Sequence, residues 1–108
     1  LHASELQDTQ AVEDSATVRK RVIEAYQWQL QRQSCLNMAL SPKQLEQFAP
    51  LNEQAALIFE KAQQRLNLSA RGYHRILRVA RTIADLAQSE QIQTGHLTEA
   101  LSYRGQHH

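Results

Sequence analysis

Four arginines share one side of a strongly amphipathic stretch over residues 69–87, and neighbouring guanidinium groups are suited to binding phosphate. At about 100° per residue, a helix over this stretch has an apolar arc with the spacing i, i+3, i+4 and i+7. The apolar arc consists of Tyr73, Ile76, Leu77, Ala80, Ile83, Ala84 and Ala87. The opposite, polar arc consists of Arg71, His74, Arg75, Arg78, Arg81, Thr82 and Asp85. We expect the apolar arc to be buried and the arginines to face a ligand or solvent.

The first turn of this helix is the most specific candidate for chemistry. Ser69 is a good N-cap, whose hydroxyl can accept a hydrogen bond from the N–H of Arg71 or Gly72. A cation in the first turn opposes the helix dipole at a cost of about 0.3–1 kcal/mol, but beside free N–H groups it forms a receptor for an anion. The pattern favours Arg71 as a phosphate contact, with Arg75 and Arg78 as weaker candidates. A solvated face of a good helix former explains the same three arginines, and spacing alone leaves both interpretations open.

Other familiar sites are missing from the sequence. It contains no GxxxxGK[ST] phosphate loop, no HExxH motif and no pair of cysteines, so neither a P-loop nucleotide site nor a zinc site is indicated. The one cysteine, Cys35, cannot form an internal disulfide, and we interpret it as a small buried apolar residue of a cytoplasmic protein. We expect no catalytic residue, no metal site and no bound cofactor in this segment by itself.

The elements that must position the arginines are predicted to be helices. With 108 residues the chain is one small domain, and an aromatic content of 6% with three glycines and two prolines is typical of a helical core. A net charge of +1 excludes a globally basic nucleic-acid binder, although a local basic stripe remains. No apolar run approaches the roughly 20 residues that span a bilayer, so we expect no membrane segment.

Composition and capping residues divide the chain into three parts. Residues 1–16 are polar without a helical period, and we expect a flexible linker that follows a missing upstream domain. Residues 17–104 form the predicted helical domain, and residues 105–108 a tail in which His107 and His108 are consistent with part of an expression tag. Helices are predicted over residues 17–33, 42–48, 52–66, 69–87 and 95–103, and their caps are Ser15, Ser41, Asn52, Ser69 and Thr94. The predicted fold class is all-α, a small bundle of four to five helices.

The run LSARGYHRILRVARTIADLA, followed by SEQIQTGHLTEALSYR, resembles the C-terminal segment of the magnesium-chelatase-related AAA+ proteins of the ComM or YifB family. The resemblance extends over residues 15–104 and includes the VRKRV segment and the region of Asn37. It implies an AAA+ lid, the small helical domain that follows the ATP-binding core of a hexameric ATPase. It also implies a parent protein that uses ATP and Mg²⁺ and acts as a DNA motor in branch migration or recombination.

The resemblance also implies a role for one arginine. In related AAA+ lids, an arginine near the start of the third lid helix, called sensor 2, contacts the γ-phosphate and distinguishes ATP from ADP. The matching position is Arg71, in the run from Ser69, so the resemblance and the anion-receptor argument indicate the same residue. Arg71 is then expected to serve the nucleotide of its own or of a neighbouring subunit. The expected partners are the upstream AAA+ core, neighbouring subunits of a homo-oligomer and, for the parent, DNA.

Two other classes of function remain open. A nucleic-acid-binding module would place Arg71, Arg75, Arg78 and Arg81 on phosphates, with a salt-dependent affinity for DNA. A subunit-interaction module would make no anion contact, and Arg71 would then pair with an Asp or a Glu. The positions of these four arginine side chains in the folded chain discriminate between a nucleotide-contacting lid, a nucleic-acid-binding module and a subunit-interaction module.

Overall fold

The regular secondary structure of the described part of the chain is helical, apart from one isolated parallel β-bridge between Leu51 and Ile92. The computed structural model describes the backbone of residues 3–103 and the side chains of residues 15–103. Within these residues lie five α-helices and one short 3₁₀ turn: α1 (Ala3–Gln33), η1 (Asn37–Ala39), α2 (Pro42–Phe48), α3 (Glu53–Leu66), α4 (Ala70–Leu86) and α5 (Thr94–Tyr103). The predicted all-α bundle of four to five helices is confirmed. The predicted tail, residues 105–108, lies outside the described residues.

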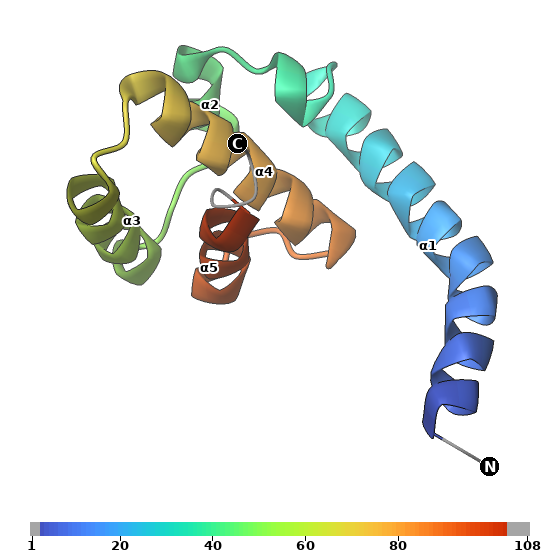
Figure 1. Cartoon of the computed structure of the whole chain (residues 1–108). Helices are drawn as coiled ribbons and strands as arrows, with labels where there is room; N and C mark the ends of the chain where they lie inside the picture. The colour runs from blue at the N-terminus through green and yellow to red at the C-terminus, as the bar shows by residue number, and fades with distance from the viewer. Residues whose placement is uncertain (1–2, 104–108) are drawn as a thin grey trace.

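Helix α4 lies at the centre of the fold (Figure 1). It contacts α1, η1, α2 and α5, while α3 contacts α5. The apolar arc of α4 faces the main core, except for Ala87, which is exposed just after the helix. The other elements contribute the buried residues Leu40, Leu45, Ala49, Ala55, Phe59, Ile92, Leu97 and Ala100. Tyr73 stacks on Phe59 with ring centroids 4.1 Å apart, which fixes α4 against α3.

Side-chain caps determine where α2 and α3 begin. Ser41 Oγ accepts from the N–H of Gln44 at 3.1 Å, and Gln44 Oε1 accepts from the N–H of Ser41 at 2.9 Å, which completes a capping box. Asn52 Oδ1 accepts from the N–H of Ala55 at 2.8 Å. Both predicted starts are confirmed, because each cap satisfies an N–H that has no partner inside its helix.

Helix α1 is longer than predicted. It begins at Ala3, whereas the sequence predicted a flexible linker over residues 1–16 and a helix from Thr17, after a cap at Ser15. Residues 1–16 contain no Gly or Pro and several good helix formers, so nothing in the segment stops the helix. The missing apolar period therefore did not prevent helix formation. Figure 1 shows the first turns of α1 running away from the other helices.

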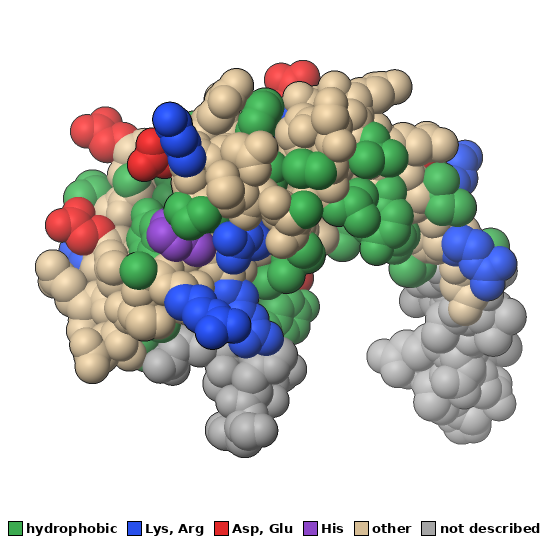
Figure 2. All heavy atoms as spheres, turned by 90° about the horizontal axis from the view of Figure 1, so that it is seen from above, with side chains coloured by type: hydrophobic (Ala, Val, Ile, Leu, Met, Phe, Trp, Pro, Cys, Tyr) green, Lys and Arg blue, Asp and Glu red, His purple; other side chains and the backbone are tan. Residues whose placement is uncertain are grey.

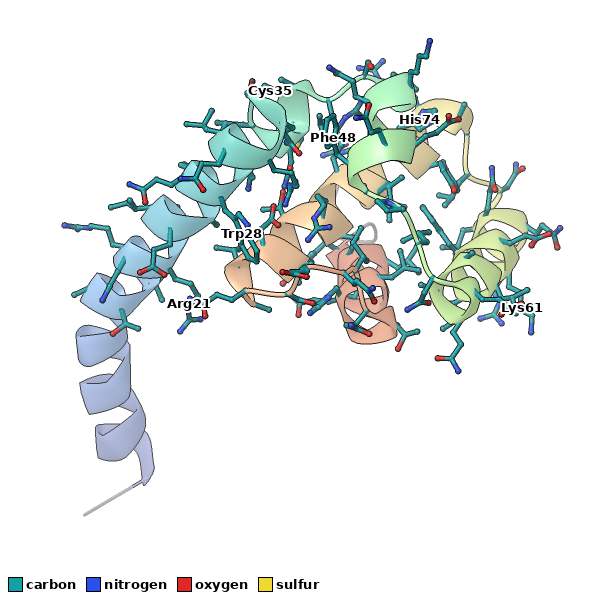
Figure 3. All side chains as sticks on the ribbon, turned by 180° about the vertical axis from the view of Figure 1, so that it is seen from behind. Arg21, Trp28, Cys35, Phe48, Lys61 and His74 are labelled. Atoms are coloured by element: carbon teal, nitrogen blue, oxygen red, sulfur yellow. The ribbon has the colours of Figure 1, made fainter. Side chains whose placement is uncertain are left out.

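The attachment of α1 to the other helices is mostly polar. Among the residues whose side chains the structure describes, none from α1 belongs to the main apolar core. The buried side chains of α1 are Ala25, Gln29 and Gln33. Trp28 is half-buried, and Figure 3 shows it on the side of α1 that faces the end of α4. The orientation of α1 against α4 therefore depends on hydrogen bonds and ion pairs.

Candidate functional site

The N-terminus of α4 has the geometry expected of an anion site. Ser69 is the N-cap, and its Oγ accepts from the N–H of Gly72 at 3.0 Å, as predicted. The first N–H groups of a helix have no partner within it, so the cap of Gly72 leaves those of Ala70 and Arg71. Both of these residues are exposed. This turn therefore presents N–H donors and a guanidinium to solvent together.

The three candidate arginines differ in what they contact. Arg71 and Arg75 are exposed, and neither has a hydrogen bond or an ion pair among the described residues. Arg75 also lines a mainly apolar pocket of about 140 Å³, together with Tyr103. Arg78 is half-buried, and its Nε donates to Leu40 O at 3.0 Å. Figure 2 shows basic side chains gathered on one face beside a histidine. Arg71 and Arg75 can meet an anion, whereas Arg78 is tied to the backbone.

Arg81 is buried, so its predicted place on the outer polar arc is wrong. Arg81 is 2% exposed, and Asp85, which was predicted on the same arc, is 1% exposed. Arg81 follows Leu77 by four residues, so at about 100° per residue it borders the apolar face. Its guanidinium donates to Ser89 O at 2.9 Å and to Glu90 O at 3.0 Å, which holds the loop after α4. The nucleic-acid interpretation therefore loses one of its four arginines.

Asp85 accepts hydrogen bonds from two guanidinium groups. Arg32, at the end of α1, donates from its two Nη atoms to the two carboxylate oxygens, at 2.8 and 3.1 Å. Arg81 donates to Oδ1 at 3.0 Å, and Asn37 Nδ2 donates to Oδ2 at 2.9 Å. Bidentate pairs between charged groups are among the strongest hydrogen bonds in proteins. This carboxylate thus joins α1, η1 and α4 at a point shielded from water.

Amide and hydroxyl side chains complete the cluster around Asp85. Asn37 Oδ1 accepts from Arg32 Nη2 at 3.0 Å and from Gln33 Nε2 at 2.8 Å. The backbone N–H of Asn37 donates to Gln29 Oε1 at 2.9 Å, and Asn37 Nδ2 also donates to Thr82 Oγ1 at 3.1 Å. We call this set the α1–α4 polar network: Gln29, Arg32, Gln33, Asn37, Arg81, Thr82 and Asp85.

Two cations against one carboxylate leave the α1–α4 polar network with a positive charge. Burial lowers the pKa of Arg81 from its ordinary value, the charge of Asp85 opposes this change, and the charge of Arg32 adds to it. An arginine nevertheless remains protonated at physiological pH, so this group exchanges no proton and its role is structural. Sequence reasoning missed the network, because its only local signal is the i, i+4 spacing of Arg81 and Asp85.

Other candidate chemistry has a structural explanation. Within residues 15–103, no group of three His, Cys, Asp or Glu side chains could hold a metal ion. Cys35 is partly buried against the core. His96 Nδ1 accepts from the N–H of Gln93 at 2.9 Å, which stabilises the start of α5. None of the described helices combines the length and the apolarity that crossing a membrane requires.

Comparison with known proteins connects this geometry to a family. Residues 12–104 match the family described as "Magnesium chelatase, subunit ChlI C-terminal". The chain is similar to the competence protein ComM of Haemophilus influenzae, with 47% identity over 92 residues. Proteins named YifB from Salmonella typhimurium and Escherichia coli are 45% and 46% identical over 92 residues. Each match covers 85% of this chain and 18% of the relative, so the chain spans less than a fifth of their length.

Proposed function

The chain belongs to the magnesium chelatase subunit ChlI C-terminal family, and we propose that it is the lid of a larger AAA+ ATPase of the ComM and YifB kind. In this proposal Arg71 contacts the γ-phosphate of ATP and couples the nucleotide state to the orientation of the lid. The observation that carries it is the position of Arg71, exposed and unpaired among the described residues, at the capped start of α4. The parent is proposed to bind ATP and Mg²⁺ in a separate core, to form a homo-oligomer, expected to be a hexamer, and to act on DNA.

The role of Arg71 follows from charge. A guanidinium binds a phosphate through two parallel charge-assisted hydrogen bonds, and the free N–H groups at the start of α4 add to the attraction. Bound ATP would supply the reacting phosphate, and Arg71 would stabilise the charge that develops on it. After the γ-phosphate leaves, Arg71 loses its partner, and the lid is free to reorient. Arg75, one turn further on, would add positive charge, while Arg78 would contribute less because Leu40 O holds its Nε.

The test is the substitution Arg71→Ala in the longer protein. Hydrogen bonds to charged groups contribute about 1.5–3 kcal/mol, so we expect ATP turnover to fall by about tenfold or more. Arg65→Ala is the matched control, because Arg65 is also an exposed arginine but lies at the end of α3. The ATP turnover of the Arg65→Ala protein should not change. Unchanged turnover in a folded Arg71→Ala protein would contradict the proposal.

The two exposed arginines also support a second candidate, DNA binding by the face that carries Arg71 and Arg75. Each neutralised phosphate lowers the slope of log association constant against log salt concentration by roughly 0.9. If only these two side chains contact phosphates, we therefore expect a slope of about −2. Fluorescence anisotropy of a labelled duplex with the 108-residue chain measures this slope. A slope near −4 would mean that cations besides Arg71 and Arg75 also contact phosphates, at roughly 0.9 each, and would contradict binding through this face alone.

The subunit-interaction module, which makes no anion contact, was expected to pair Arg71 with an Asp or a Glu. Among the described residues Arg71 has no such partner, and Asp85 instead pairs with Arg32 and Arg81. The structure therefore offers no ion pair within the described chain that would occupy Arg71 and prevent it from reaching a phosphate.

A further inference from the structure

An apolar groove of about 200 Å³ lies where α1, η1 and α4 meet. Its walls include Tyr26, Leu36, Met38, Val79 and Ile83. None of the described side chains that line it carries a charge. Its volume is below the roughly 300–1,000 Å³ of small-molecule sites. The size and the neutral lining suit one or two apolar side chains of a protein segment, and they do not suit a nucleotide.

The groove continues into an apolar stripe along α1. Ile23, Tyr26 and Leu30 have the spacing i, i+3, i+7, which places them on one face of the helix. They are 49%, 47% and 50% exposed. Figure 2 shows hydrophobic side chains gathered where α1 meets the other helices. Single exposed apolar residues are normally scattered over a protein surface, whereas contiguous exposed apolar surface is typical of an interaction site.

A buried donor in the groove wall lacks an acceptor. Gln29 is 1% exposed and lines the groove. Its Oε1 accepts from Asn37 N–H, but its Nε2 has no hydrogen-bond partner among the described residues. A buried donor without a partner is unfavourable, so an occupant that brings an acceptor close to this amide is favoured. This observation is independent of the apolar surface. Because the Nε2 atom is itself buried, the Gln29 amide has to turn toward the groove for an acceptor of the occupant to reach it.

We propose that the groove binds an apolar segment of the longer protein that lies outside these 108 residues. The segment would insert one or two large apolar side chains and present a backbone carbonyl oxygen to Gln29, as a helix or strand does when it docks in a groove. The relatives support this source, because the chain covers only 18% of their length, and a protein of similar length would have most of its residues available to provide the segment. The inference rests on the proposed function in one respect, that the chain is one domain of a longer protein. It does not depend on the phosphate contact, because Arg71 does not line the groove.

Cysteine labelling tests this docking. Tyr26→Cys and Ile23→Cys report on the groove and its stripe, and Leu57→Cys on α3, where Leu57 is 53% exposed, is the matched control. Each variant is made in the longer protein and in the 108-residue chain, and maleimide labelling rates are read by peptide mass spectrometry, which separates these positions from native Cys35. Ile23→Cys leaves every groove residue in place, so it reports docking even if Tyr26→Cys weakens it.

We expect the stripe positions to react at least about tenfold more slowly in the longer protein than in the 108-residue chain, because a docked site reacts only when it opens locally. The control should react equally in both. Equal rates at both stripe positions would overturn the proposal, as would equal protection of the α3 control. Protection that appears in the 108-residue chain as its concentration rises would assign the groove to a second copy and also overturn it. None of these outcomes depends on ATP turnover, so the lid proposal stands or fails separately.

Discussion

At the scale of single residues, Asp85 is the side chain on which α1, η1 and α4 converge. Asp85→Asn should destabilise the fold by about 3–5 kcal/mol, because Arg81 would keep its buried charge without a counter-charge. Chemical denaturation followed by circular dichroism measures the loss. Glu60→Gln, an exposed change on α3, is the control and should change the free energy of unfolding by less than about 0.5 kcal/mol. An Asp85→Asn chain as stable as the control would show that the α1–α4 polar network adds no net stability.

The same network shows how far single residues can be interpreted from sequence. Arg71 was predicted from a cap, a helix position and a family resemblance; the cap and the position are local, and the structure shows the expected cap and an exposed side chain. Arg81 carries the same charge and was placed on the same arc, yet it is buried. Its buried guanidinium donates to Asp85, Ser89 O and Glu90 O, and Asp85 is in turn held by Arg32 from the end of α1. A pattern within one helix contains no information about a partner 53 residues away along the chain.

At the scale of elements, the end of α1 contains a correctable strain. Ser34 follows the helix with φ 63°, a left-handed conformation, and its N–H donates to Leu30 O at 3.0 Å. A Cβ in this conformation costs roughly 1 kcal/mol, and glycine removes that cost while making the unfolded chain more flexible. Ser34→Gly should therefore stabilise the fold by about 0.5 kcal/mol in urea denaturation. Ser34→Ala keeps the Cβ and should bring no gain; an equal gain from both variants would contradict this explanation.

Helix boundaries could be predicted wherever a side chain ends or begins the helix. Ser41, Asn52 and Ser69 each accept from the N–H three residues later, and α2, α3 and α4 start where the sequence predicted. The start of α1 could not be predicted in this way, because residues 1–16 contain neither a helix breaker nor an apolar period. Amphipathic spacing reports packing, and a helix that leaves the body of the protein has little packing to report.

At the scale of the whole molecule, the fold has two parts with different physical origins. Helices α2 to α5 share the main apolar core, which the sequence predicted from the arc on α4. Helix α1 joins them through the α1–α4 polar network and leaves an apolar stripe uncovered. The core could be predicted because burial follows local periodicity. The attachment of α1 could not, because it depends on pairs between residues that are distant in sequence.

This division leads to a prediction for the whole chain. Deleting residues 1–14 should leave the free energy of unfolding within about 0.5 kcal/mol of the parent value, because the first turns of α1 run away from the other helices and isolated helical turns add little stability (Figure 1). Urea denaturation followed by the near-ultraviolet signal of Trp28 is the measurement, since Trp28 lies on the retained part of α1, facing α4 (Figure 3). The expected result is an unchanged midpoint with a smaller helical signal in circular dichroism. A loss of about 2 kcal/mol or more, the size expected when a buried apolar side chain is removed, would show that these turns pack on the body of the protein. With an unchanged midpoint, the first turns of α1 would add no measurable stability, and the ion pair of Arg32 with Asp85 would remain the contact that holds the rest of α1 on α4.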